Sequence, residues 1–125
     1  MRYTLLLHYP EMSAEELGEE ALKVGMAAFD AYAKALDEAD VLLSAEVLAP
    51  STATTTISRK TGELLIQDGP FAETKEQLAG FYLIEARDLD EAIQLAAKIP
   101  PARVGSIEVR PIRPIRESPR RGSGS

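Results

Sequence analysis

The chain lacks cysteine, and among its 125 residues it has a single histidine, His8. The absence of cysteine excludes disulfides, thiolate metal sites and cysteine nucleophiles. One histidine with scattered carboxylates does not make a zinc site, and there is no Asp-rich loop of the calcium-binding type. We therefore expect no metal site, and the lack of cysteine fits a reducing compartment.

Long apolar runs and nucleotide-binding motifs are also missing. Only three consecutive leucines precede His8 and Pro10, too few for the core of a signal peptide or for a membrane span. Neither a Gly-x-Gly-x-x-Gly pattern nor a P-loop pattern occurs. These absences predict a cytoplasmic protein with no membrane segment and no bound cofactor.

The formal charge of −6 is unevenly distributed. Residues 1–109 carry 9 basic and 19 acidic groups, whereas residues 110–125 carry 5 arginines and one glutamate. An acidic body repels phosphate backbones, so we expect no nucleic-acid binding by the folded part.

The composition predicts one globular domain with a short tail. Hydrophobic residues make up 45% of the chain and charged residues 27%, which is ordinary for a soluble domain. Residues 116–125 are rich in Ser, Gly, Pro and Arg, a composition typical of a flexible basic tail. We therefore expect a domain over residues 1–115 and a tail over residues 116–125.

The periodicity of the first half predicts a strand, a helix and a second strand. Residues 3–9 alternate, with His8 opposite the main apolar row. Ser13 and Glu16 form a capping box, and a helical apolar stripe follows, made of Leu22, Met26, Phe29, Ala33 and Leu36. Residues 41–48 read as the second strand, which Pro50 ends.

The second half predicts a hairpin, a strand, a helix and a strand. Residues 52–59 and 63–67 flank a turn at Gly62, and residues 80–87 are apolar on both faces, as in a central strand. Asp88 and Glu91 repeat the capping pattern ahead of a second helix that ends at Pro100. A last strand is expected from Ser106 to about Arg110.

This order is a split β-α-β pattern repeated twice, which predicts an α+β, ferredoxin-like antiparallel sheet with two helices on one face. Two helices cover only one face of such a sheet, yet several strands are apolar on both. We therefore expect a homodimer in which two sheets face each other.

Between the hairpin and the central strand lies the stretch Asp68-Gly69-Pro70-Phe71-Ala72-Glu73-Thr74-Lys75-Glu76. This stretch resembles the DGPFAETKE motif of the YCII-related family, in its DGPF-domain branch. The Thr-rich hairpin, the GFYLIEA strand, the DLDEA helix start and the EVRPI strand extend the resemblance over roughly residues 2–115.

The resemblance implies a dimeric ferredoxin-like fold of the α/β-barrel type. Some members of the wider family are thought to pair a histidine with an aspartate as an acid–base dyad, and one activity ascribed to the group eliminates HCl from a chlorinated aromatic. Asp68 matches the aspartate, but Phe29 and Asp30 stand where the family's helix histidine is expected. Members of this branch are often associated with genes for sigma factors of the extracytoplasmic-function type.

From the residues alone, Asp68 has two interpretations. Asp-Gly-Pro is a turn former, because Asp bonds backbone amides, Gly accepts positive φ and Pro fixes the next dihedral. Alternatively, the turn holds a catalytic carboxylate beside His8, whose near-neutral intrinsic pKa suits proton transfer. A lone histidine on a strand is more often structural, so both interpretations stay open.

The ligand-binding candidates are Gly69, Pro70, Phe71, Glu73, Lys75 and Tyr82. Glu73 and Lys75 would clamp a polar ligand or form surface ion pairs, while Phe71 and Tyr82 would form aromatic walls or pack in the core. The function predicted first is a small-molecule enzyme of elimination or isomerisation type that uses His8 and Asp68. The alternatives are a ligand-binding or regulatory dimer and a purely structural interaction module.

Overall fold

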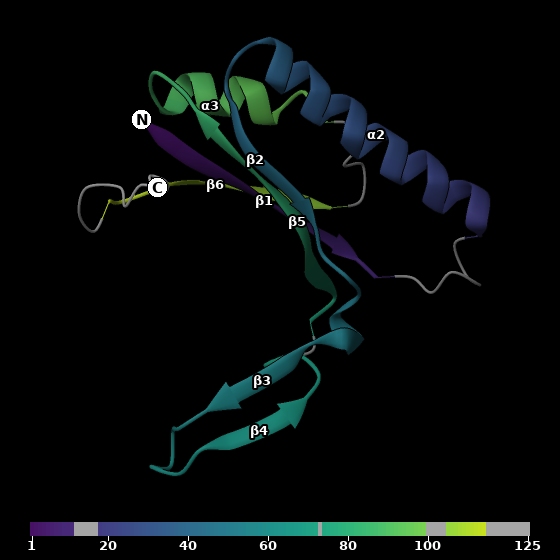
Figure 1. Cartoon of the computed structure of the whole chain (residues 1–125), viewed down its shortest axis with the longest axis vertical. Coiled ribbons are helices and arrows are strands. Elements are labelled where there is room, and N and C mark those ends of the chain that lie inside the picture. Colours follow the sequence, from purple (N-terminus) through teal and green to yellow (C-terminus); the bar gives the residue numbers. More distant parts are fainter. Residues whose placement is uncertain (12–17, 73, 100–104, 115–125) are drawn as a thin grey trace, which may run out of the picture.

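The protein was analysed as a computed structural model that describes residues 1–11, 18–72, 74–99 and 105–114. Figure 1 shows the elements, which in chain order are β1 (Arg2–Pro10), α2 (Glu19–Glu38), β2 (Leu42–Val47), the short 3-10 helix η1 (Ser51–Ala53), β3 (Thr55–Ser58), β4 (Leu65–Asp68), β5 (Glu76–Glu85), α3 (Leu89–Ala96) and β6 (Ser106–Pro111).

The main sheet has four antiparallel strands in the order β2-β5-β1-β6. The connection through α2 joins β1 to β2 with β5 inserted between them, and the connection through α3 joins β5 to β6 with β1 inserted between them. This is the split β-α-β arrangement repeated twice. The predicted α+β class and the predicted order of elements are confirmed, including the central position of β5.

Strand β5 begins earlier than the sequence predicted. It starts at Glu76, which pairs with Pro10, rather than at Gly80. The residues at its start, Glu76 and Gln77, are polar and so gave no strand signal. Here β5 pairs with β1 but lies beyond its ladder with β2, which ends at Gly80, and half-buried polar residues are tolerated. The capping box expected at Ser13 and Glu16 and the tail over residues 116–125 lie outside the described residues.

The core lies between the sheet and the two helices, which cover the same face (Figure 1). Alternate residues of β1 and β5 point into it, as the two-residue period requires. The main buried side chains are those of Tyr3, Leu5, Leu7, Tyr32, Leu36, Tyr82, Ile84, Ala92 and Ala96. The expected cap of α3 is present, since the Asp88 carboxylate accepts the Glu91 backbone N–H at 3.0 Å.

Helix α2 packs on the sheet with only its second half. Tyr32 and Leu36 are buried there, whereas Leu22 and Met26, which belong to the same predicted apolar stripe, are 46% and 50% exposed. The second half of the predicted apolar stripe packs in the core. The first half does not, because the described side chains of the sheet do not fill the space beneath it.

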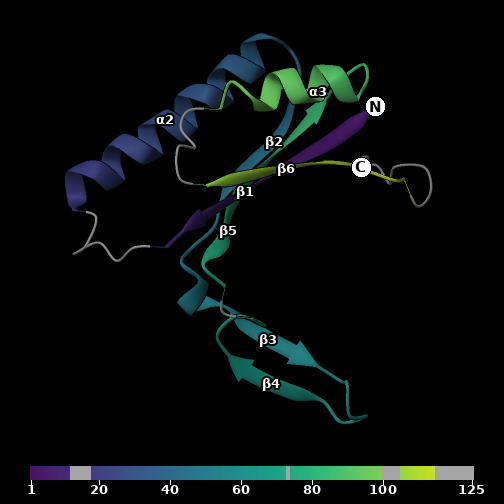
Figure 2. The same ribbon diagram turned by 180° about the vertical axis from the view of Figure 1, so that it is seen from behind.

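The hairpin of β3 and β4 forms a separate two-stranded sheet. Figures 1 and 2 show from opposite sides that it projects from the end of the main sheet, away from the helices. Ile57 and Ile66 form a cross-strand pair in this hairpin, and each of the two residues is 64% exposed.

Three aromatic rings set the position of α2 over the sheet. Tyr82 of β5 stacks on Phe29 with ring centroids 4.5 Å apart and meets Tyr32 edge-on at 5.2 Å. The Tyr82 hydroxyl donates to the Phe29 carbonyl oxygen at 2.9 Å, and the Tyr32 hydroxyl donates to the Leu95 carbonyl oxygen in α3. Burial raises the pKa of Tyr32 to about 12, and burial, aided by nearby negative groups, also raises the pKa of Tyr82.

These raised pKa values predict a loss of stability at high pH. The neutral phenol of Tyr32 is favoured in the folded state, so its contribution is complete below the unfolded pKa of about 10 and is lost as pH rises through about 12. We expect this residue alone to account for roughly 2 to 3 kcal/mol of that loss. Urea unfolding of wild type and Tyr32→Phe at several pH values measures it. The variant should be less stable near neutrality but decline less steeply above pH 10, and equal slopes would contradict the assignment.

Candidate functional site

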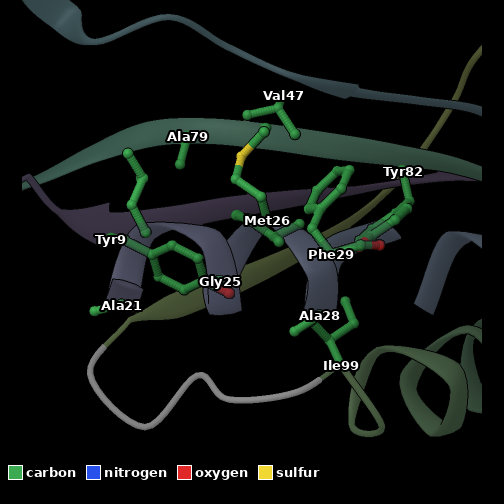
Figure 3. A pocket seen from close by; sticks show the side chains of 13 residues that line it. Tyr9, Ala21, Gly25, Met26, Ala28, Phe29, Val47, Ala79, Tyr82 and Ile99 are labelled. Carbon is green, nitrogen blue, oxygen red and sulfur yellow. The ribbon is translucent and has the colours of Figure 1, made fainter. Parts of the chain in front are cut away.

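The sheet and the first half of α2 enclose a cavity of about 290 Å³. Figure 3 shows the lining, with Tyr9 at one end and with Phe29 and Tyr82 at the other. The lining residues come from three strands, β1, β2 and β5, from α2 and from the segment after α3, and they are Leu7, Tyr9, Ala21, Leu22, Gly25, Met26, Ala28, Phe29, Val47, Ala79, Gly80, Tyr82 and Ile99. The cavity is partly open to solvent, and Leu22 and Met26 in its lining are about half exposed.

Small residues create this space. On α2, Ala21, Gly25 and Ala28 lie four and three residues apart and so share one side of the helix. A Cβ at Gly25 would have no atom within 4 Å, which shows the room available there. On the sheet, a Cβ at Gly80 would lie 2.7 Å from the Glu46 carbonyl oxygen, so the close pairing of β2 and β5 requires glycine at this position.

A β-bulge adds to the cavity floor. The register of β1 and β5 shifts between Leu7, which pairs with Gly80, and His8, which pairs with Leu78. Ala79 is thereby the extra residue in β5, and it lines the cavity together with Gly80. Two adjacent residues without large side chains therefore face α2.

The cavity is almost wholly apolar. Within the described part of the chain, the only polar side-chain groups in its lining are the hydroxyls of Tyr9 and Tyr82. Burial raises the pKa of both tyrosines, so both phenols are neutral at physiological pH. The cavity thus offers apolar contact and hydroxyl groups but no charge.

His8 lies on the opposite face of the sheet, as the alternation of β1 predicted. Its Nε2 is 2.6 Å from Oε1 of Glu108 in β6, and because a carboxylate only accepts, Nε2 carries the proton that is donated. The two side chains are 26% and 58% exposed. The carboxylate partner of His8 within the described chain is therefore Glu108, which the sequence analysis did not single out.

Asp68 lies at the end of β4, in the projecting hairpin, where it pairs with Thr55 and is exposed. Gly69 follows with φ of +98°, its N–H donates to the Thr54 carbonyl oxygen at 2.7 Å, and its own carbonyl accepts from the Thr56 hydroxyl at 2.7 Å. The DGP segment therefore forms the turn out of the hairpin, and Gly69 supplies the positive φ that this turn needs. Among the described residues, no hydrogen bond or ion pair joins Asp68 to His8.

The remaining ligand candidates are divided between the hairpin and the cavity. Pro70 is half-buried, and Phe71 is 71% exposed with the Lys60 ammonium 4.3 Å from its ring centroid. Lys75 is exposed, and Glu73 lies outside the described residues. Tyr82 is the one predicted site residue that lines the cavity.

Sequence reasoning missed Tyr9, Gly25 and Gly80 as parts of a site. The available signal was the run of Ala21, Gly25 and Ala28 along the predicted helix, adjacent to the apolar stripe. Small residues on the sheet-facing side of an amphipathic helix indicate either close packing or a space, and only coordinates distinguish the two.

The part of the chain that the structure describes contains no group of three or more His, Asp or Glu side chains placed to hold a metal ion. Neither described helix has the length and apolarity needed to cross a membrane.

Comparison with known proteins places the chain in a family. The sequence profile of the YCII-related domain matches residues 1–116. An uncharacterised protein of Rhizobium meliloti (strain 1021) is 40% identical over 114 residues, which cover 90% of this chain and 92% of that protein. The match extends over β1 through β6 and so includes every strand and helix described above. The chain belongs to the YCII-related domain family.

Proposed function

We propose that this YCII-related protein binds a small, mainly apolar molecule in the cavity between α2 and the sheet. The observation that carries the proposal is an apolar space of about 290 Å³ with a solvent opening, which is close to the lower end of the range for small-molecule sites. Ordinary cores are packed without voids of this size, so the half-exposed first half of α2 is explained if a ligand completes the packing.

Binding fits the cavity better than catalysis does. Proton transfer near neutral pH needs a group whose pKa lies near the working pH, and the two tyrosines in the lining have pKa values above the ordinary range for tyrosine. Apolar contact, by contrast, contributes roughly 25 cal/mol for each Å² of apolar surface removed from water.

A pair of variants at Gly25 tests the proposal. Leucine at this position should fill the cavity from the helix side, whereas alanine adds only one methyl group into open space. Both replace glycine in a helix and should stabilise the fold by up to about 1 kcal/mol. Toluene is a suitable probe, with binding followed by NMR chemical-shift changes at the lining residues.

We expect Gly25→Ala to bind toluene about as well as wild type, and Gly25→Leu to bind it at least about tenfold more weakly, since removing this contact costs more than about 1.4 kcal/mol. Thermal unfolding checks that both variants are folded. Equal binding by Gly25→Leu and wild type would contradict the proposed cavity, and so would the absence of any shift in wild type.

A second candidate is acid–base chemistry at His8, which the short contact with Glu108 favours. A carboxylate bonded to an imidazole orients the ring and stabilises its charged form, as in other acid–base pairs. Asp68, the partner proposed from the sequence, would then have to come from the hairpin of a second chain. For this candidate, the reaction class that we propose is elimination or isomerisation, the class predicted from the resemblance to the YCII-related family.

Chloride release from a chlorinated aromatic tests this candidate. General acid–base groups contribute about 10²- to 10⁴-fold, so His8→Asn should lower the rate by at least about 100-fold. Glu108→Gln and Asp68→Asn should lower it too, and Glu46→Gln, at an exposed carboxylate paired with Phe81 in the sheet, is the control. A wild-type protein that releases no chloride, or a His8→Asn variant of unchanged rate, would remove the candidate.

We also propose that the protein acts as a homodimer with the open faces of two sheets in contact. Leu6 pairs with Phe81, and Thr4 with Leu83, so these side chains share the face that neither described helix covers. The apolar members of this group are only half-buried in one chain. A second copy would remove them from water by symmetric contact.

Light scattering at micromolar concentration should therefore give twice the mass of a 13.6 kDa chain. Leu6→Lys places a charge in the proposed interface and should shift the protein to monomer. Val24→Lys, on the 62% exposed side of α2, should remain dimeric. A monomeric wild type, or a Leu6→Lys variant that stays dimeric, would disprove the proposal.

A further inference from the structure

The two hydroxyls of the cavity differ in their hydrogen bonding. The Tyr82 hydroxyl already donates to the Phe29 carbonyl oxygen at 2.9 Å. For the Tyr9 hydroxyl, the described part of the chain provides no hydrogen-bond partner, and Figure 3 shows its ring directed toward α2 near Gly25. Burial raises the pKa of Tyr9, so its proton is present at neutral pH. With respect to the described residues, the cavity therefore contains one hydroxyl proton that is already donated and one that a ligand could accept.

The Tyr9 ring is held in place before any ligand arrives. A Cβ at Gly105 would overlap Cδ1 of Tyr9 and would lie 2.5 Å from the His8 carbonyl oxygen, so the ring packs directly on the backbone there. Only glycine allows this approach. A donor that is already held in position loses little conformational entropy on binding. More of the free energy of its hydrogen bond therefore contributes to the affinity.

Charge restricts the ligand further. Among the described residues, none of those that line the cavity carries a formal charge. Moving a charged group from water into an apolar space without a partner costs far more than one hydroxyl returns. The volume of about 290 Å³ corresponds to roughly ten water-sized units of liquid volume, which suits a molecule of about the size of a substituted benzene.

We infer that the ligand of this cavity is an uncharged, mainly apolar molecule with one hydrogen-bond acceptor, such as a carbonyl or ether oxygen, that Tyr9 binds through its hydroxyl. The inference rests on the proposed function and adds the chemical class of the ligand and the residue that selects it. Phe29 and Tyr82 contact the apolar end of the molecule, and Tyr9 orients its polar end. Tyr9 is thus a specificity residue for binding.

Three probes of nearly the same shape test the inference: acetophenone, which has a carbonyl acceptor, α-methylstyrene, which has none, and benzoate, which is charged. We expect wild type to bind acetophenone about five- to tenfold more tightly than α-methylstyrene, as one net hydrogen bond predicts. Benzoate should bind at least about 100-fold more weakly than acetophenone. Isothermal titration calorimetry or NMR titration gives the three dissociation constants.

Tyr9→Phe is the decisive variant, because it removes the hydroxyl and keeps the ring that packs on Gly105. It should lower the affinity for acetophenone to that for α-methylstyrene and leave the latter unchanged. Equal affinities for the two neutral probes in wild type, or a preference that survives Tyr9→Phe, would overturn the role of Tyr9. Tight benzoate binding would overturn the neutral class. If none of the probes binds wild type, or if Gly25→Leu leaves all binding unchanged, the cavity itself is not the site and the proposed function fails with it.

Discussion

The contact of Tyr82 with Phe29 and Tyr32 determines how far α2 stands from the sheet. Tyr82 is fully buried, stacks on the Phe29 ring and donates a hydrogen bond to the Phe29 carbonyl oxygen. The distance between the middle of α2 and the sheet is therefore set by the aromatic side chains packed between them. From that point toward the start of the helix, the sheet presents Ala79 and Gly80, which are too small to reach across the same gap. The cavity follows directly from this step in side-chain size along β5, because a rigid helix cannot bend down to fill it.

The close approach of β2 to β5 also requires a residue without a side chain at position 80. Gly80 lies so close to the Glu46 carbonyl oxygen that any Cβ would force β2 and β5 apart. A large residue at this position would therefore disturb the sheet before it filled the cavity. The space is built into the pairing of the edge strand β2 with the central strand β5, and it does not result from loose packing of a mobile side chain.

Much of the fold could be predicted because it depends on residues that are present. The alternation of Tyr3, Leu5 and Leu7 gave the buried face of β1, and the bond from the Glu91 N–H to Asp88 is the cap that the sequence predicted. The start of β5 at Glu76 was missed, since its polar residues look like a loop although backbone pairing with β1 includes them. Backbone pairing leaves no signature in side-chain polarity at such a half-buried strand end.

The candidate site was harder to predict, because it is defined by missing side chains. The DGPF motif directed attention to Asp68, whose segment forms the turn that ends the hairpin, while Ala21, Gly25 and Ala28 carry no functional group that would mark a site. Of the predicted site residues, Tyr82 lines the cavity and His8 lies on the face expected from alternation. The pairing of His8 with Glu108 depends on β6 lying beside β1, about a hundred residues away in sequence, which no local pattern encodes.

The proposed acid–base chemistry of His8 and the proposed ligand binding by Tyr9 are located on opposite faces of the sheet. His8 and Tyr9 are neighbours in sequence, but a strand directs successive side chains to opposite faces, so the imidazole and the phenol are separated by the thickness of the sheet. The ion pair of His8 with Glu108 faces the surface on which a second chain would pack, and the phenol faces a space without charge. A molecule bound in the cavity would therefore meet a neutral donor and apolar walls, whereas the proton transfer proposed for His8 would take place on the other side of the sheet. Because the backbone fixes this division, a change of side chain at either position cannot merge the two sites.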